Sequence, residues 1–429
     1  MSETALWHPF SDMAAVKDAE MVVSRGEGIW LWDDHGNRYI DGAASLWYAQ
    51  VGHGRQEIID AVSAQMQKLE AYSCFTELAT PPALELAQML SDRSPMEGSK
   101  VFLTTGGGEA IDTAAKLTRL YWDVMGQSDR IHIVSRTSGY HGAHGFGTSI
   151  GGMPPNRAGF GPLITDTSQV EYDSVDALER KIGEIGSEKI ASFFFEPVIG
   201  AGGVLPPPDG YVEAVTELCQ SLGILVVADS VICGFGRLGS WFGVERFGIK
   251  PDMITFAKGV TSGYLPVGGL VVSGKVAEPF WSEPGRVAFR HGPTYAGHAA
   301  CCAAGIANIG IMEREGLVTR GQELEGVLLE SLGSLADHEL VDEVRGGVGL
   351  LGAVDLDKRI VERVPGAANR LGVHVRDAGT ITRPSLRGVP VSPPLTITPE
   401  EIGQITESLR VGLDEFAKTE AVQGALAVA

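Results

Sequence analysis

The chain has 429 residues, which at about 150 residues per domain suggests two or three domains. Its 54 acidic residues outnumber the 34 basic ones and give a formal net charge of −20. A surface this acidic repels nucleic acids and anionic membranes, so neither is expected as a partner.

The five cysteines and the start of the chain indicate the compartment. The cysteines are scattered and odd in number, which argues against a disulfide framework, and no CxxC pair suggests a zinc site. The sequence MSETALWHPF is unlike a signal peptide, and no apolar run reaches the 18 residues of a membrane span. We therefore expect a cytoplasmic protein that binds no metal.

Two short patterns open the chain. Residues 20–45 alternate as short strands do, with a turn at 33–37. Apolar residues at three- and four-residue spacing then predict helices over 56–70 and 82–92.

From about residue 100 to residue 275, short apolar runs alternate with helical patterns. Such runs are typical of strands buried on both faces of a parallel sheet, and the alternation predicts a doubly wound α/β domain. Ligands of such sheets bind at the carboxyl ends of the strands. The runs are KVFLTT, RIHIVSR, IASFFFEPV, GILVVADSV, DMITFAKG and GGLVVSG. Beyond residue 300, long helical patterns and two strand-like pieces at 349–355 and 389–397 predict a smaller α+β region.

A glycine turn lies between the run KVFLTT and the helical pattern that follows it. Gly106, Gly107 and Gly108 would present free backbone N–H groups and the positive end of a helix dipole to an anion. The turn matches neither GxGxxG nor a P-loop, and a connector without a ligand fits the same pattern.

Three other side chains follow predicted strands. Tyr140 could stack on a flat ligand or simply pack. Asp229 ends a wholly apolar strand, where a carboxylate is costly to desolvate unless it has a partner. Lys258 ends another such strand; a dry site would make it a nucleophilic amine, and the alternative is a lysine that extends to water.

Together these signals describe a site for pyridoxal 5′-phosphate. The glycine turn would hold the phosphate, and Tyr140 would stack on the ring. Asp229 would pair with the pyridinium nitrogen so that the ring acts as an electron sink. Lys258 would hold the aldehyde as a Schiff base.

Over nearly its whole length the chain resembles the class III aminotransferases, which are fold type I pyridoxal-phosphate enzymes. Within that class, Leu46-Trp47, Ile232 and the segment IDTAAKLTRLYW resemble the ω-transaminases, or amine:pyruvate transaminases. The segments that carry the resemblance are Ser138–Gly142, Glu196-Pro197 with Gly200–Val204, Val227–Gly239, Pro251–Gly268, His291–His298 and Ser392–Leu395.

The resemblance implies an α/β architecture in two domains. A large domain over 56–300 would carry a mainly parallel sheet with helices on both faces and would bind the cofactor. A smaller α+β domain would be formed by both chain ends, residues 1–55 and 301–429.

The resemblance also assigns roles to single residues. Thr294 matches a hydroxyl that reaches the phosphate from the neighbouring subunit, which implies a homodimer with shared active sites. Arg383 falls where a mobile arginine binds the substrate carboxylate. The remaining matches are Lys258 and Asp229 as catalytic residues, Gly107, Gly108, Tyr140, His141 and Val231 at the cofactor, and Trp47, Phe75 and Tyr140 in the substrate pocket.

Three departures from the family pattern stand out. The family reads Ser-Gly-Ser-Glu where this chain has three glycines before Glu109, so two hydroxyls are missing at the phosphate loop. Holding the phosphate then falls more to backbone N–H groups and Thr294. Ser230 replaces an acid beside Asp229, and Pro293 replaces an aromatic residue.

The implied activity is a ping-pong transamination. An amine donor displaces Lys258, which then moves a proton, and a keto acid such as pyruvate takes up the amino group. The alternatives are another reaction on the same fold (an aminomutase, racemase or decarboxylating enzyme), a non-catalytic homologue, and a nucleotide-binding dehydrogenase. The dehydrogenase requires a GxGxxG helix start that the chain lacks.

Overall fold

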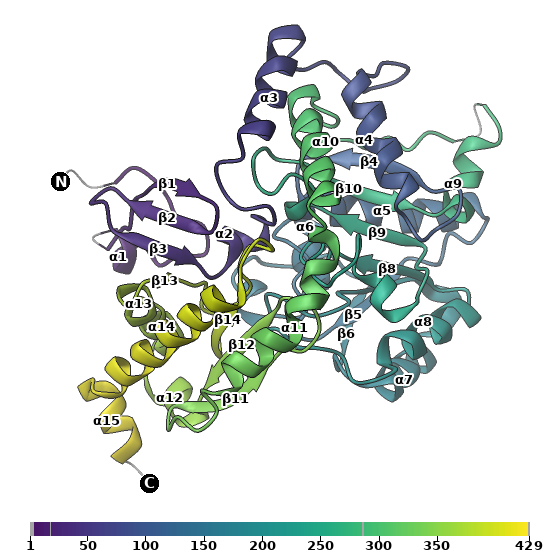
Figure 1. The fold of residues 1–429 in the computed structure, drawn as a ribbon. Coiled ribbons are helices and arrows are strands. Elements are labelled where there is room, and N and C mark those ends of the chain that lie inside the picture. The colour runs from purple at the N-terminus through teal and green to yellow at the C-terminus, as the bar shows by residue number, and fades with distance from the viewer. Residues whose placement is uncertain (1–3, 18, 285–286, 428–429) are drawn as a thin grey trace.

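The computed structural model describes residues 4–17, 19–284 and 287–427. Its centre is a seven-stranded sheet in the order β4-β10-β9-β8-β7-β5-β6 (Figure 1). The strands are β4 (Lys100–Thr104), β5 (His132–Arg136), β6 (Thr167–Val170), β7 (Ile190–Phe195), β8 (Leu225–Asp229), β9 (Met253–Phe256) and β10 (Gly268–Val272). The six apolar runs of the sequence therefore all form strands of one sheet.

The central strands are buried on both faces because helices cover both. Every residue of β7, β8 and β9 is buried. Successive side chains of a strand point to opposite faces. Phe194 lies in a core cluster with residues of α5, while Phe193 and Phe195 lie in the cluster that includes α7 and α8. The helices against this sheet are α5 (Gly107–Val124), α6 (Gly145–Ile150), α7 (Val175–Ile185), α8 (Tyr211–Ser221) and α9 (Gly274–Trp281).

The sheet is mainly parallel, as predicted, with one exception. Strands β5 to β9 pair in parallel, whereas β10 runs antiparallel to both β4 and β9. The interpretation of the run GGLVVSG as a further parallel strand is thus wrong. The connection from β9 to β10 contains only the single-turn helix η4 (Lys258–Val260), and a parallel crossover needs a dozen or more residues, usually with an α-helix.

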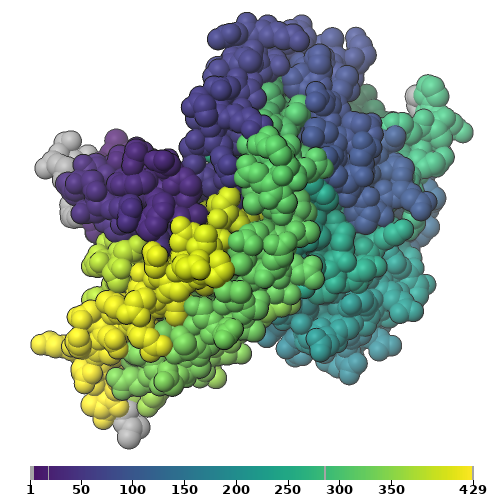
Figure 2. Space-filling view, in the orientation of Figure 1, coloured from purple at the N-terminus to yellow at the C-terminus, as the bar shows by residue number. Residues whose placement is uncertain are grey.

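The two ends of the chain meet in a second sheet. Its order is β1-β2-β3-β13, and β13 (Thr380–Ile381) pairs in parallel with β3 (Arg38–Asp41). Figures 1 and 2 show the purple N-terminal strands against the yellow-green C-terminal elements, apart from the teal strands of the large sheet. The other strands of the chain ends are β1 (Val23–Glu27), β2 (Trp30–Asp33), β11 (Val341–Arg345), β12 (Gly352–Leu356) and β14 (Gly388–Val391).

The remaining helices include those predicted after residue 55. Helices α3 (Gln56–Lys68) and α4 (Pro81–Asp92) confirm the two early predictions, and both pack against α10 (Ala299–Arg314). The domain boundaries at 55/56 and 300/301 stay a prediction. Also present are α1 (Met13–Val16), α2 (Ala44–Trp47), α11 (Leu317–Gly333), α12 (Lys358–Arg363), α13 (Ala367–Asp377), α14 (Pro399–Ala417) and α15 (Glu420–Ala427).

The structure also bears on disulfides, membrane spans and metal sites. All five cysteines are free thiols. Across the described ranges, no helix is long and apolar enough to cross a membrane. No cluster of three or more potential metal ligands occurs in that same part of the chain.

Candidate active site

A cavity of about 510 Å³ opens at the carboxyl ends of the central strands. This is where a doubly wound sheet is expected to bind its ligand. Each strand from β4 to β9, apart from the edge strand β6, is followed by or ends in residues that line the cavity. They include Gly106–Gly108 after β4, Tyr140–His144 after β5, Glu196 after β7, Asp229 at the end of β8 and Lys258 after β9.

Asp229 is buried and held on both oxygens. His141 Nδ1 donates to Asp229 Oδ2 at 2.8 Å. Asp229 Oδ1 accepts hydrogen bonds from Thr255 Oγ1 and Val231 N, each at 3.2 Å. The partners fix the direction of the carboxylate and compensate for its desolvation. His141 Nε2 is buried and has no hydrogen-bond partner among the described residues.

Lys258 occupies a backbone conformation that lysine rarely adopts. Its φ of +50° lies in the left-handed region, where a residue with a Cβ is strained. Burial lowers the pKa of Lys258; the positive charge of Arg383 lowers it further, and the carboxylates of Asp229 and Glu196 act in the opposite direction. The strained backbone is therefore combined with an amine that is easier to deprotonate than an exposed lysine.

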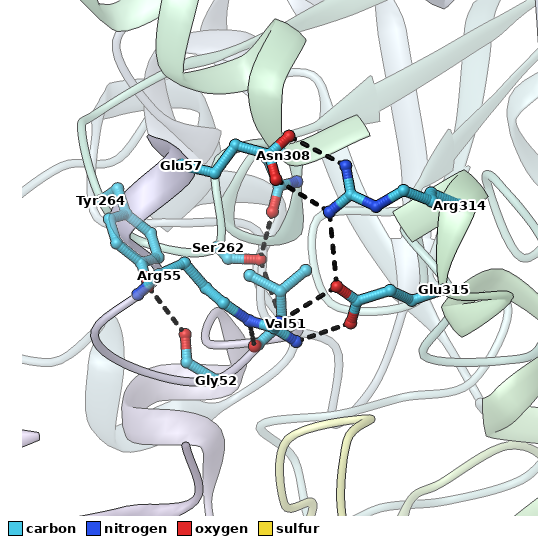
Figure 3. A network of polar contacts seen from close by, with 9 residues as sticks. All are labelled: Val51, Gly52, Arg55, Glu57, Ser262, Tyr264, Asn308, Arg314 and Glu315. Atoms are coloured by element: carbon cyan, nitrogen blue, oxygen red, sulfur yellow. Dashed lines mark hydrogen bonds and ion pairs between the residues drawn. The ribbon is translucent and has the colours of Figure 1, made fainter. Parts of the chain in front are cut away.

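The turn after Lys258 is fixed by a polar network, drawn in Figure 3. Asn308 Nδ2, on α10, donates to the carbonyl oxygens of Gly259 at 2.9 Å and Val260 at 3.0 Å. Ser262 Oγ donates to Asn308 Oδ1 at 2.6 Å and accepts from Val51 N at 3.2 Å. These bonds tie the lysine turn to α10 and to the N-terminal segment.

A second part of the network holds the end of the same turn. Tyr264 Oη donates to the carbonyl of Gly52 at 3.1 Å and accepts from Arg55 N at 2.6 Å. The guanidinium of Arg55 forms a bidentate pair with Glu315 at 3.1 and 2.8 Å (Figure 3). The strain at Lys258 is thus maintained by segments far from it in the sequence.

The glycine turn begins α5 and leaves its N–H groups free. Thr105 donates from N and Oγ1 to Glu109 Oε2, at 2.8 and 2.7 Å, so the acid folds back on the loop. No described residue accepts from the N–H groups of Gly107 and Gly108, as is usual in a first helical turn. A Cβ at Gly107 would lie 2.9 Å from Val231 Cγ1, so glycine is required there.

Tyr140 is positioned through its backbone by Glu196. Tyr140 N donates to Glu196 Oε1 and Gly200 N donates to Glu196 Oε2, both at 2.9 Å. Burial raises the pKa of Glu196. Glu196 belongs to a motif of the family resemblance that assigned it no role of its own. Its signal was the same as that of Asp229, an acid directly after an apolar strand.

Trp47 and Arg383 are brought together beside the lysine. Trp47 is buried, with Lys258 Nζ 5.8 Å from the centre of its ring and Arg383 Cζ 5.6 Å from it. Arg383 itself is exposed and lies on the segment between β13 and β14. Residues 47 and 383 thus meet beside Lys258 although they are more than 300 positions apart.

Four predicted residues, Trp47, Phe75, Thr294 and Arg383, are not among those that line the cavity. Trp47 and Arg383 lie beside Lys258, whereas Phe75 and Thr294 lie at the surface. Phe75 is 47% exposed and Thr294 is exposed, and neither belongs to the cavity lining. The two segments lie side by side, since a Cβ on Gly292 would be 3.6 Å from Phe75 Cζ. A single chain therefore does not bring Phe75 to its own cavity, and its place in the substrate pocket stays a prediction.

The residues present fit pyridoxal 5′-phosphate. Free N–H groups, a carboxylate held by hydrogen bonds and an amine of lowered pKa all line the one cavity. His144, which no sequence pattern indicated, also lines this cavity beside Gly108.

The comparisons with known proteins agree with this geometry. The family model "Aminotransferase class-III" matches residues 13–413. The putrescine–pyruvate aminotransferase of Pseudomonas aeruginosa is 37% identical, with 95% of this chain and 94% of that protein covered. The omega-aminotransferase of Caulobacter vibrioides is 32% identical, with 95% and 96% covered.

Solved structures show the same similarity. An (S)-enantioselective omega-transaminase from Thermomicrobium roseum superposes with a TM-score of 0.91 at 36% identity, covering 95% of this chain and 96% of its own. A PLP-bound amine transaminase from an uncultivated Pseudomonas species gives 0.92 at 34% identity, with 96% and 99% covered.

The fold and these relatives define a pyridoxal-phosphate-dependent transferase of fold type I. The chain belongs to the class III aminotransferases. It is an enzyme that uses pyridoxal 5′-phosphate and transfers an amino group from an amine to a keto acid.

Proposed function

We propose that the enzyme takes amino groups from amines or ω-amino acids that lack an α-carboxylate and passes them to a keto acid such as pyruvate. One observation carries the assignment of the residues. Asp229 and Lys258, at the ends of adjacent strands, share one cavity with the free N–H groups that begin α5. The relatives named for putrescine–pyruvate and omega-amine transfer support this substrate class and favour transamination over the alternative reactions.

The cofactor would be held at three places. The N–H groups of Gly107 and Gly108 would bind the phosphate. Asp229, oriented by His141, would face the pyridine nitrogen, and the ring would lie between Tyr140 and Val231. When bound, pyridoxal phosphate supplies an electron sink for the bond that breaks at the donor carbon.

Lys258 has two tasks in this proposal. Its Nζ holds the aldehyde end of the cofactor in the resting enzyme. Once the donor displaces it, the same amine moves a proton as general base and then as general acid, for which a lowered pKa is favourable. The hydrogen bonds from Asn308 to the carbonyls of Gly259 and Val260 would keep Nζ in place during both tasks.

We assign Arg383 to the carboxylate of the keto acid. A donor without a carboxylate and an acceptor with one must use the same pocket, and a permanently buried unpaired cation would be costly. Arg383 is exposed yet lies 5.6 Å from the Trp47 ring, so its side chain can serve the acceptor and return to water for the donor.

Replacing Arg383 with Ala should slow the pyruvate half-reaction by about ten- to a hundredfold. A charge-assisted contact to a carboxylate is worth about 1.5–3 kcal/mol. The half-reaction with a neutral aryl amine should stay nearly unchanged, as should both half-reactions in the control Arg376→Ala. Single-turnover absorbance measurements decide it, and equal losses in both half-reactions would remove Arg383 from this role.

We also propose a homodimer whose active sites are shared. Phe75 and Thr294 lie together on the surface, outside the cavity of their own chain. This placement supports their delivery to the cavity of a second copy, where Thr294 would reach the phosphate and Phe75 the substrate pocket.

Mixed dimers test the shared site. Lys258→Ala and Thr294→Ala each damage a different half of the proposed composite site. Mixing the two variants after reversible dissociation should restore activity above the sum of the separate variants, because one site per hybrid is intact. A fully active monomer in light scattering would contradict the proposal.

The substrate class is tested by a panel of amine donors with pyruvate, read as alanine formed. Diamines and aryl-alkyl amines should support turnover. If only α-amino acids do, the proposed donor class is wrong although transamination stands.

A further inference from the structure

The phosphate end of the cavity has few side chains free to donate a hydrogen bond. The glycine turn has no side-chain donor, and Thr105 Oγ1 already donates to Glu109. Thr261 Oγ1 donates to the carbonyl of Leu265 and Tyr264 Oη to that of Gly52. A phosphate group carries close to two negative charges on three terminal oxygens, each of which can accept more than one hydrogen bond. The backbone N–H groups of the glycine turn would therefore leave some of these oxygens without a donor.

Beside the glycine turn, the lining includes one side chain that is not committed elsewhere, His144. Its carbonyl accepts from Thr148 N, which fixes its backbone at the start of α6. Its ring nitrogens make no hydrogen bond to any residue the structure describes, and the side chain is exposed. The other nitrogen donors of the cavity have roles already, Lys258 at the aldehyde and His141 on Asp229.

The imidazole of His144 stands directly over Gly108. A Cβ built on Gly108 would lie 3.2 Å from His144 Nδ1 and 3.3 Å from His144 Cε1. The backbone of Gly108 is also close to Gly142, whose own Cβ would be 2.9 Å from Gly108 Cα. A side chain at position 108 would therefore crowd the ring, which would have to shift by a few tenths of an ångström.

We propose that His144 donates a hydrogen bond from its imidazole to the phosphate of the cofactor, and that glycine at position 108 leaves the ring uncrowded in that place. An imidazole carries an N–H donor in either protonation state. The inference rests on the phosphate lying at the start of α5, as proposed above. It assigns to one histidine the side-chain contact that the three-glycine turn cannot make.

Binding of two forms of the cofactor to the apoenzyme tests this inference. The dissociation constants of pyridoxal 5′-phosphate and of pyridoxal, which lacks the phosphate, are measured by fluorescence titration. His144→Ala should weaken binding of the phosphorylated form by about ten- to a hundredfold and leave pyridoxal binding unchanged. The control His35→Ala, at an exposed turn, should change neither constant.

A second pair of variants tests whether a hydroxyl at position 108 can replace the imidazole of His144 as the donor to the phosphate. Gly108→Ser in the native background should weaken binding of the phosphorylated form, because the new side chain displaces the ring. In the His144→Ala background the same serine has room, and its hydroxyl should recover part of the lost affinity. Thermal unfolding of each apoprotein shows that the variants are folded, and the cofactor-induced rise in Tm should follow the measured affinities.

The outcomes distinguish the role of His144 from the proposed position of the phosphate at the start of α5. A native enzyme that binds pyridoxal as tightly as its phosphate would show that the phosphate site itself is wrongly placed. A native enzyme that prefers the phosphate, with the preference intact in His144→Ala, would overturn the role of His144 alone. A double variant no tighter than His144→Ala would contradict the exchange between His144 and position 108.

Discussion

Lys258→Ala should lower the rate of transamination on the order of 10³- to 10⁴-fold. In the proposed mechanism, the substitution removes the group that moves the proton, a contribution of about 10²- to 10⁴-fold, together with the attachment of the cofactor. Borohydride reduction of the native holoenzyme should fix the cofactor on the peptide that contains Lys258, read by mass spectrometry, and should fix none on the variant.

The matched control for this variant is Lys275→Ala. Lys275 is an exposed lysine whose ammonium lies 3.0 Å from Asp252, far from any proposed chemistry. It should keep full activity and cofactor attachment. Reduction that labels a lysine other than Lys258 would show that the nucleophile is assigned wrongly.

Asp229→Asn should lower turnover by roughly 10²- to 10³-fold, the magnitude typical of losing one fixed electrostatic contact. The amide keeps the shape of the side chain and its contact with Thr255, and it loses the negative charge that would face the pyridine nitrogen in the proposed site. The absorption band of the bound cofactor should shift as well, because the ring nitrogen loses its partner.

Asp252→Asn is the control for burial of a carboxylate. Asp252 is also buried and accepts from Val226 N at 2.9 Å, and its variant should lose stability without losing the cofactor band. If Asp229→Asn and Asp252→Asn lower turnover equally per folded molecule, Asp229 has a structural role only.

The sequence predicted most of the large sheet because its strands are buried on both faces. Runs such as IASFFF and ILVVAD have the length of a strand and are shorter than a typical buried helix. They form β7 and β8. Strand β6 was missed because its residues, TSQV, are polar and lie at the sheet edge. The direction of β10 was missed because an apolar run is the same in both directions.

The candidate site was predictable where an ionisable residue directly follows an apolar strand. Asp229 and Lys258 meet that condition, and the structure places both in the cavity. Glu196, which directly follows the apolar strand β7, meets the same condition and also lines the cavity. His144 gave no such signal, since it lies in an irregular connection and is recognised only by its place over Gly108. The approach of Arg383 to Trp47 depends on how the two chain ends pack, which no local pattern encodes.

The most direct test of the account follows the nitrogen atom through a complete cycle. The holoenzyme is given a ¹⁵N-labelled amine without acceptor, freed of excess donor, and then given pyruvate. The account predicts that the first step bleaches the cofactor band and releases one equivalent of carbonyl product, and that the second restores the band and yields ¹⁵N-alanine. Carbonyl product without bleaching, or alanine free of ¹⁵N, would contradict it.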